Sequence, residues 1–191
     1  MVQLIVPSEQ CLPSYAAALQ RGWSPDNERG RAAALDELEQ IEADPAAFVA
    51  SLDDAEGKGA PVTMPDGSVV PRLPGFRRWI WDGEVAGSIG FRWQHGTVEL
   101  PPYCLGHIGY SVVPWKQRRG YATAAVLSLL EEARRLGLPY VEITANPDNL
   151  PSQKVILAAG GTLHERFTKP PQFGSTPCLR FRIALSSLPS R

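Results

Sequence analysis

The sequence has few cysteines, little net charge and no long apolar run, and each of these shortages excludes a class of protein. Its three cysteines, Cys11, Cys104 and Cys178, are odd in number and widely spaced, so we expect free thiols and neither a disulfide framework nor a metal site. Nineteen basic and twenty acidic residues give a net charge of -1, which provides no general attraction to nucleic acid or to an anionic membrane. A polyanion would have to be held by a local basic patch.

The absence of a membrane-spanning or exported segment points to a soluble, cytoplasmic protein. No window approaches the roughly 18 apolar residues of a membrane span, and the N-terminal sequence MVQLIVPSEQ has neither the basic lead nor the cleavage site of a signal peptide. Of the 191 residues, 43% are hydrophobic and 20% are charged, as in ordinary globular proteins. This length suits one domain, so we expect residues 1–191 to form a single folding unit.

Proline and glycine are abundant instead, with 18 and 17 residues, and they divide the chain into three parts. Residues 1–60 read as a short strand followed by helices, with a break at Pro45. Residues 61–75 read as a loop because prolines and glycines interrupt any regular pattern there. Residues 76–185 alternate between strand and helix patterns and form the expected cofactor-binding core.

The order of elements in the third part predicts an α+β fold. Aromatic and β-branched residues favour strands, Asp82-Gly83 is a strong two-residue hairpin turn, and a 3.6-residue period predicts an amphipathic helix that Gly137 ends. The expected elements are strands at 76–81, 85–93 and 107–113, a helix at 118–136, a strand at 140–145, a helix at 150–159, and strands at 162–167 and 178–185. Together they make a mixed sheet with helices packed on it.

A basic, glycine-containing loop between the strand at 107–113 and the long helix is suited to an anion. Backbone N–H groups at a helix start lack intrahelical acceptors, and Gly120 lets a ligand approach the backbone closely. Lys116, Arg118 and Arg119 add positive charge at the same place. The loop contains neither GxxxxGKS/T nor GxGxxG, which disfavours ATP, GTP and NAD. A solvated basic helix start is the alternative interpretation.

Two motifs in this region resemble the acetyl-CoA signature of the GNAT N-acetyltransferase superfamily. The first is Gln117-x-x-Gly120-x-Ala122, after a strand that ends in Val112-x-Pro114. The second is Asn149-Leu-Pro-Ser152, followed by Gly160-Gly161. The layout is closer still to a bacterial branch of predicted acetyltransferases with HIGY, GYA and GG motifs, which here are residues 107–110, 120–122 and 160–161. The resemblance covers residues 70–185 well and the first 60 weakly.

The resemblance implies a fold, a cofactor and a way of holding it. The implied GNAT fold is a central mixed, mostly antiparallel sheet with a splayed parallel strand pair, flanked by helices. The implied cofactor is acetyl-CoA, with its pantetheine arm on the main chain of the splayed strand and its pyrophosphate in the glycine loop. An ordinary buried strand is the alternative interpretation of that strand. The residues implied at the cofactor are Tyr110, Ser111, Val112, Val113, Gln117, Arg118, Arg119, Gly120, Tyr121, Ala122, Thr123, Asn149 and Ser152.

The implied reaction is direct attack of an amine on the thioester, which needs a proton acceptor for the amine and a proton donor for the thiolate. Many family members carry a tyrosine donor seven residues after the motif asparagine, where this chain has Ile156, so Ser152 one turn away is the candidate substitute. His107 is the expected base because histidine titrates near neutrality, and Glu99 and Glu142 are the alternatives. A core histidine with satisfied hydrogen bonds is the competing interpretation of His107.

The acceptor site is expected beside the hairpin strands, with Trp81, Arg92 and Glu99 as its candidate residues. Arg92 raises the hypothesis of an acceptor that carries a carboxylate or a phosphate. Cys104 has no histidine signature near it and is not expected to act as a nucleophile. The implied partner is the amine of a small molecule or peptide, with neither nucleic acid nor membrane, and formation of a homodimer stays open.

Three functions compete for this sequence. The leading prediction is an acetyl-CoA-dependent N-acetyltransferase. A catalytically silent module that binds acyl-CoA as a regulator is the main alternative, because the usual tyrosine is absent at Ile156. A nucleic-acid-binding domain that uses Arg118 and Arg119 is disfavoured by the neutral charge balance.

Overall fold

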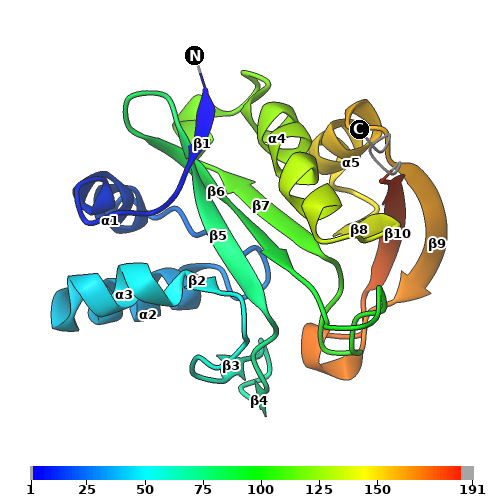
Figure 1. The fold of residues 1–191 in the computed structure, drawn as a ribbon, viewed down its shortest axis with the longest axis horizontal. Helices are drawn as coiled ribbons and strands as arrows, with labels where there is room; N and C mark the ends of the chain where they lie inside the picture. The colour runs from blue at the N-terminus through cyan, green and yellow to red at the C-terminus, as the bar shows by residue number, and fades with distance from the viewer. Residues whose placement is uncertain (1, 186–191) are drawn as a thin grey trace.

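The computed structural model describes residues 2–185, and these residues form two larger antiparallel sheets that lie next to each other and a separate two-stranded sheet (Figure 1). The larger sheet has the order β1-β5-β6-β7, and β2 also pairs with β5. Its strands are β1 (Gln3–Ile5), β2 (Asp53–Asp54), β5 (Gly75–Trp81), β6 (Val85–Arg92) and β7 (Ile108–Val112). The smaller sheet has the order β8-β10-β9, with β8 (Tyr140–Ala145), β9 (Thr162–Thr168) and β10 (Pro177–Ala184). The elements from β5 onward follow the order predicted from the sequence.

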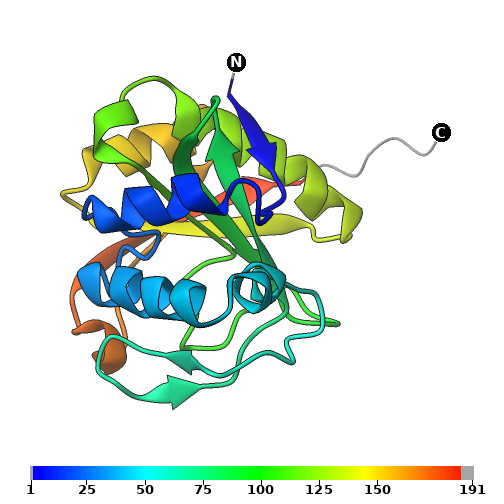
Figure 2. The same ribbon diagram turned by 90° about the vertical axis from the view of Figure 1, so that its left-hand side faces the viewer.

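Helices cover both faces of the larger sheet. The first face carries α1 (Leu12–Gln20), α2 (Arg31–Ala43) and α3 (Pro45–Ser51), which stand in front of the sheet in Figure 2. The opposite face carries α4 (Tyr121–Arg135), and α5 (Leu150–Ala158) packs beside α4 and against β8 of the smaller sheet (Figure 1). The predicted break at Pro45 is confirmed: Asp44 ends α2 and caps α3 by accepting the N–H of Ala47 at 2.9 Å. No helix among residues 2–185 is both long enough and apolar enough to cross a membrane.

Two apolar clusters stabilise these layers. The cluster under α4 contains Phe91 of β6, Leu129 of α4 and Ile143 of β8, all buried. Leu129 lies on the apolar stripe predicted from the 3.6-residue period, so the amphipathic helix is confirmed. The cluster under α1 is aromatic, and the rings of Tyr15 and Trp79 stack with centroids 4.6 Å apart.

The structure differs from the predicted elements in two places. The segment predicted as a loop contains a hairpin whose two strands, β3 (Val62–Thr63) and β4 (Val69–Val70), have two residues each. The turn after β5 has three residues rather than two, because Trp81 pairs with Val85 and the register shifts between Ile80 and Trp81.

Candidate active site

His107 joins the two sheets at the point where they separate. Its backbone N–H donates to the carbonyl of Glu142 at 2.8 Å, and its Nδ1 accepts the N–H of Glu142 at 3.0 Å. Its Nε2 lies 3.0 Å from the carbonyl of Val98, which can only accept, so the proton is on Nε2. Beyond this junction, within residues 2–185, β7 and β8 share no strand pairing. The expected gap between these strands is therefore present.

The same contacts define the charge state of His107. The residue is 1% exposed, and its burial lowers the pKa of the imidazole below its ordinary value, against the opposing effect of Glu142. Both ring nitrogens are engaged by backbone groups, so no lone pair is left to accept a proton from an amine. The geometry matches the competing interpretation of the sequence, a core histidine with satisfied hydrogen bonds.

The main chain of β7 faces the gap at alternate residues. The N–H of Val113 donates to the carbonyl of Ala86 on β6 at 3.0 Å, and in an antiparallel ladder the same direction recurs every second residue. Ser111 therefore also bonds toward β6, while the main-chain groups of Tyr110 and Val112 point toward the gap. Of the four strand residues predicted at the cofactor, two present their main chain to the gap.

Residues on the first face hold this strand from behind. Trp23 Nε1 donates to Ser111 Oγ at 2.9 Å, and Ser111 Oγ donates to the carbonyl of Ser24 at 2.9 Å. The Asn27 side chain donates to the carbonyl of Tyr110 at 2.9 Å. Sequence reasoning missed Asn27, because its only signal is a turn-forming SPDN stretch whose partner lies 83 residues away.

The start of α4 is exposed and leaves its first N–H groups without a side-chain cap. Gly120 is the residue before the helix, has φ 76°, and no side chain caps the first turn. Arg118 also has a positive φ of 61°, a conformation that turns successive N–H groups to one side of a loop. The side chains of Gln117, Arg118 and Arg119 are exposed beside this helix start. Tyr121, Ala122 and Thr123 form its first turn, as the motif requires.

Lys116 does not add charge to this site, which corrects the sequence prediction. Its Nζ is paired with Asp82 at 2.5 Å and with Glu84 at 2.8 Å, both in the turn between β5 and β6. Tyr121 Oη donates to the other Asp82 oxygen at 2.8 Å. Although burial opposes it, hydrogen bonds from Lys116 and Tyr121 hold the pKa of Asp82 below its ordinary value. The turn thus fixes the loop that leads into α4.

A pair of hydroxyl groups crosses the gap between β7 and α5. Tyr110 Oη lies 2.9 Å from Ser152 Oγ, and Asn149 caps α5 by accepting the Ser152 N–H at 3.1 Å. Burial raises the pKa of Tyr110 to about 12, against the opposing effect of the Ser152 hydrogen bond, so its hydroxyl stays protonated near neutrality. Ile156, one turn further along α5, is fully buried in the core.

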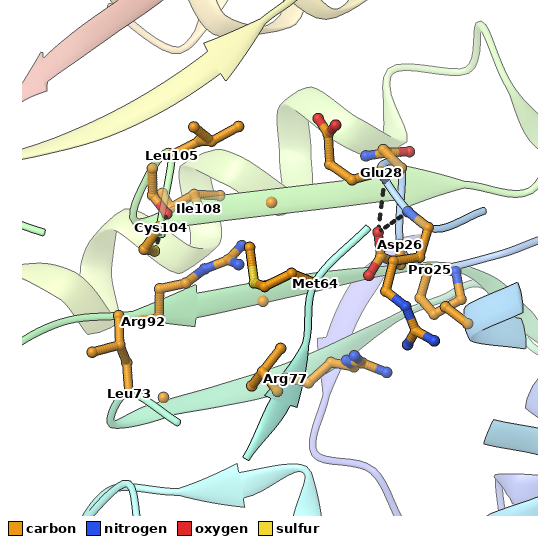
Figure 3. Close-up of a pocket in the computed structure, with 18 of the residues that line it drawn as sticks. Pro25, Asp26, Glu28, Met64, Leu73, Arg77, Arg92, Cys104, Leu105 and Ile108 are labelled. Atoms are coloured by element: carbon orange, nitrogen blue, oxygen red, sulfur yellow. Dashed lines mark hydrogen bonds between the residues drawn. The ribbon is translucent and has the colours of Figure 1, made fainter. Parts of the chain in front are cut away.

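An open cavity of about 720 Å³ extends from the gap across the first face of the sheet (Figure 3). Arg92, Tyr110, Asn149 and Ser152 line it, so the structure brings these predicted residues together. The other predicted residues lie elsewhere. Trp81 packs against the aromatic cluster, Glu99 is exposed on a loop, and the Glu142 carboxylate is paired with Arg182 at 2.8 Å and Arg180 at 3.5 Å on β10.

Comparison with known proteins agrees with this geometry. The family model described as an acetyltransferase (GNAT) domain matches residues 31–162 of the chain. No curated protein matches the sequence.

Solved structures with a similar fold include three acetyltransferases. A complex of the microcin C7 self-immunity acetyltransferase MccE with acetyl-CoA and AMP has 15% identity and a TM-score of 0.62, with 96% of this chain and 92% of that chain covered. The ribosomal L7/L12 α-N-protein acetyltransferase RimL with coenzyme A has 13% identity and a TM-score of 0.62, with 98% and 96% covered. The aminoglycoside acetyltransferase AAC(6')-Ib with coenzyme A and kanamycin has 14% identity and a TM-score of 0.59, with 98% and 96% covered.

Proposed function

The chain belongs to the GNAT acetyltransferase family and is an acetyl-CoA-dependent acetyltransferase, and from this premise we propose that it acetylates a primary amine of a small molecule or peptide. The observation that carries the proposal is the continuity of three features. The gap-facing main chain of β7 leads, within the ten residues from Tyr110 to Arg119, to the uncapped start of α4, and the large cavity opens at the Tyr110 end of this path.

The residues present fit acetyl-CoA along this path. An amide-rich arm needs backbone partners, and the N–H groups of Tyr110 and Val112 supply donors toward the gap. The carbonyls of these two residues already accept from the side chains of Asn27 and Gln117. A pyrophosphate needs N–H donors and positive charge, which the first turn of α4 supplies together with Arg118 and Arg119. Asn149 and Ser152 border the far side of the gap. When bound, acetyl-CoA supplies an activated acyl group, and no covalent enzyme intermediate is required.

We assign the proton donor to the hydroxyl pair of Tyr110 and Ser152. The pair occupies the gap one turn before Ile156, and the Tyr110 hydroxyl stays protonated near neutrality. Ser152 can pass a hydrogen bond to Tyr110 as the latter donates, which keeps both oxygens satisfied. The proton-donor role predicted for Ser152 is thus assigned to Tyr110 and Ser152 together.

For the amine, we propose that its proton leaves to water in the open cavity. His107 has no free nitrogen, and the Glu142 carboxylate is held by two arginines. Activity should then rise with pH according to the acceptor's own pKa. A free amine at the cavity wall has direct access to the gap, because Tyr110 and Ser152 line both.

The binding part of the proposal is tested by a matched pair of glycines at the two ends of α4. Gly120 and Gly137 have nearly the same φ, 76° and 74°, and each has open space around a hypothetical Cβ. Gly120→Glu and Gly137→Glu therefore impose similar strain, but only the first puts a negative charge at the phosphate site. We expect calorimetry to show loss of acetyl-CoA binding in Gly120→Glu and near-normal affinity in Gly137→Glu. Equal affinities would place the cofactor elsewhere.

Turnover is tested by thiol release from acetyl-CoA against a panel of amines. Release that depends on the amine, with the acetylated amine identified by mass spectrometry, supports the proposal. Tight acetyl-CoA binding without release on any amine would instead identify a catalytically silent acyl-CoA-binding module.

A further inference from the structure

Most charged side chains that line the cavity form ion pairs with one another, and the exceptions are one cation and the carboxylate of Asp26, which accepts the backbone N–H groups of Glu28 and Arg29. Three arginines and a lysine each have a carboxylate partner: Arg29 with Asp36 at 2.5 Å, Arg72 with Asp54 at 4.0 Å, Arg77 with Glu37 at 2.7 Å, and Lys169 with Glu28 at 2.7 Å. Within residues 2–185, Arg92 is the lining cation that has no such partner. The cavity therefore presents one uncompensated guanidinium.

The fold places this guanidinium where the two sheets separate. Arg92 ends β6, and its backbone N–H donates to the carbonyl of His107, the junction residue, at 2.9 Å. Its Nη2 lies over Gly109 of β7, only 2.7 Å from where a Cβ at that position would be. The bare backbone of Gly109 thus makes room for the guanidinium at the base of the gap.

The surroundings of Arg92 strengthen its preference for an anion. In Figure 3 the side chains of Arg92 and Met64 point toward each other, with Cys104 and Ile108 beside them. Met64 and Ile108 are buried and apolar, while Arg92 itself is exposed, so an anion in the cavity can reach the guanidinium and finds no competing polar group on these two neighbours. Burial raises the pKa of the Cys104 thiol, against the opposing effect of Arg92, so this thiol stays neutral and does not offset the guanidinium.

We infer that the acceptor amine carries a carboxylate or phosphate group, which Arg92 binds. The inference rests on the proposed function, since it assumes that the acceptor enters this cavity. A guanidinium offers five N–H donors in a planar fork that matches either anion. The same charge disfavours a polyamine without an anionic group, because an additional ammonium would be repelled at the place where the amine must react.

The experiment compares pairs of amines with and without an anionic group, with each rate expressed per concentration of unprotonated amine because the members of a pair differ in basicity. The probes are L-phenylalanine with L-phenylalaninamide, O-phosphoethanolamine with ethanolamine, and spermidine as the purely cationic amine. Thiol release gives kcat/KM for each with the native protein, Arg92→Gln, Arg92→Lys and Arg135→Gln. Arg135 is exposed in the last turn of α4, so its variant loses the same charge away from the cavity.

We expect the native protein to prefer the anionic member of at least one pair. Arg92→Gln should lower kcat/KM for that member roughly tenfold to a hundredfold, as expected for a hydrogen bond to a charged group, and change the neutral member little. Arg92→Lys should restore part of the loss, since it keeps the charge without the fork. Arg135→Gln should keep the native ratio. A native ratio near one, or the same ratio in Arg92→Gln, would overturn the inference.

A binding measurement separates this inference from the proposed function. The N-acetylated forms of the same probes are titrated calorimetrically into the CoA-bound protein, which requires no turnover. Preference for the anionic product that disappears in Arg92→Gln supports the inference even where no amine is acetylated. Gly109→Ala should reduce the preference by displacing the guanidinium, and should add nothing in the Arg92→Gln background. Absence of any preference in the native protein would overturn the inference.

Discussion

His107 and Tyr110, three positions apart on one strand, have different tasks because their polar atoms meet different partners. His107 has both ring nitrogens bonded to backbone groups from two distant segments, which makes it a connector between sheets. Tyr110 has its hydroxyl bonded to another hydroxyl at the gap, where a third group can join. A change at His107 should therefore alter the free energy of unfolding, and a change at Tyr110 should alter kcat.

Protonation of His107 should make the protein less stable in acid. Burial holds the pKa of the folded imidazole below 6.5, against the opposing effect of Glu142, while Arg92 and Arg182 act in the same direction as burial. The unfolded chain then binds more protons, so the free energy of unfolding should fall as the pH drops below about 6.5, by at most about 1.4 kcal/mol per pH unit. Urea unfolding at several pH values measures this slope. The slope should shrink in His107→Gln and persist in His164→Gln, which changes an exposed histidine on β9.

Removal of the Tyr110 hydroxyl should slow the transfer step. Tyr110→Phe keeps the ring and the main chain that faces the gap, so KM for acetyl-CoA should change little. Loss of a proton donor should lower kcat by roughly a hundredfold, and Ser152→Ala should have a smaller effect because the tyrosine remains. Tyr103→Phe removes a hydroxyl from the wall of the same cavity and serves as the control. Equal kcat values for the two Tyr→Phe variants would remove Tyr110 from the mechanism.

Regular elements were predictable where their signal is local. The helix expected at 118–136 is observed as Tyr121–Arg135, and the strand expected at 107–113 as Ile108–Val112. Both predictions depend on the period of apolar side chains and on the residues that end each element, Pro114 for the strand and Gly137 for the helix. These signals act within a few residues. The short N-terminal strand was predicted and is observed as β1, whereas β2, β3 and β4 have two residues each and are too short to show a period.

Only the cofactor half of the proposed site has a local sequence signal, for the same physical reason. The motif around Gly120 is contiguous, whereas the partners of Lys116, Glu142 and His107 lie 34, 40 and 35 residues away. From the sequence, Lys116 is predicted to bind phosphate because it lies beside a glycine loop. In the structure, Asp82 and Glu84 of the turn between β5 and β6 pair with it instead. The long-range ion pairs, not local propensity, decide which charges remain available to a ligand.

The first and last thirds of the chain meet across the cavity through an ion pair between a buried ammonium and a carboxylate whose side chain is 37% exposed. Lys169 follows β9, and its side chain is 3% exposed, yet its Nζ lies 2.7 Å from Glu28 in the segment between α1 and α2. These residues are 141 positions apart. A buried ammonium is costly without its carboxylate, so this pair should contribute to the stability of the whole assembly of helices and sheets.

Glu28→Gln should therefore lower the free energy of unfolding by about 1 to 3 kcal/mol, because it leaves the Lys169 ammonium with a neutral partner. The matched control is Glu56→Gln, which removes the partner of Lys58 in a pair whose side chains are 68% and 81% exposed and should cost less than about 1 kcal/mol. Urea unfolding in low and high salt measures both. Added salt should shrink the effect of Glu56→Gln more than that of Glu28→Gln, since water and ions screen an exposed pair more completely. Equal losses in the two variants would mean that the Lys169 pair does not tie the two ends of the chain together.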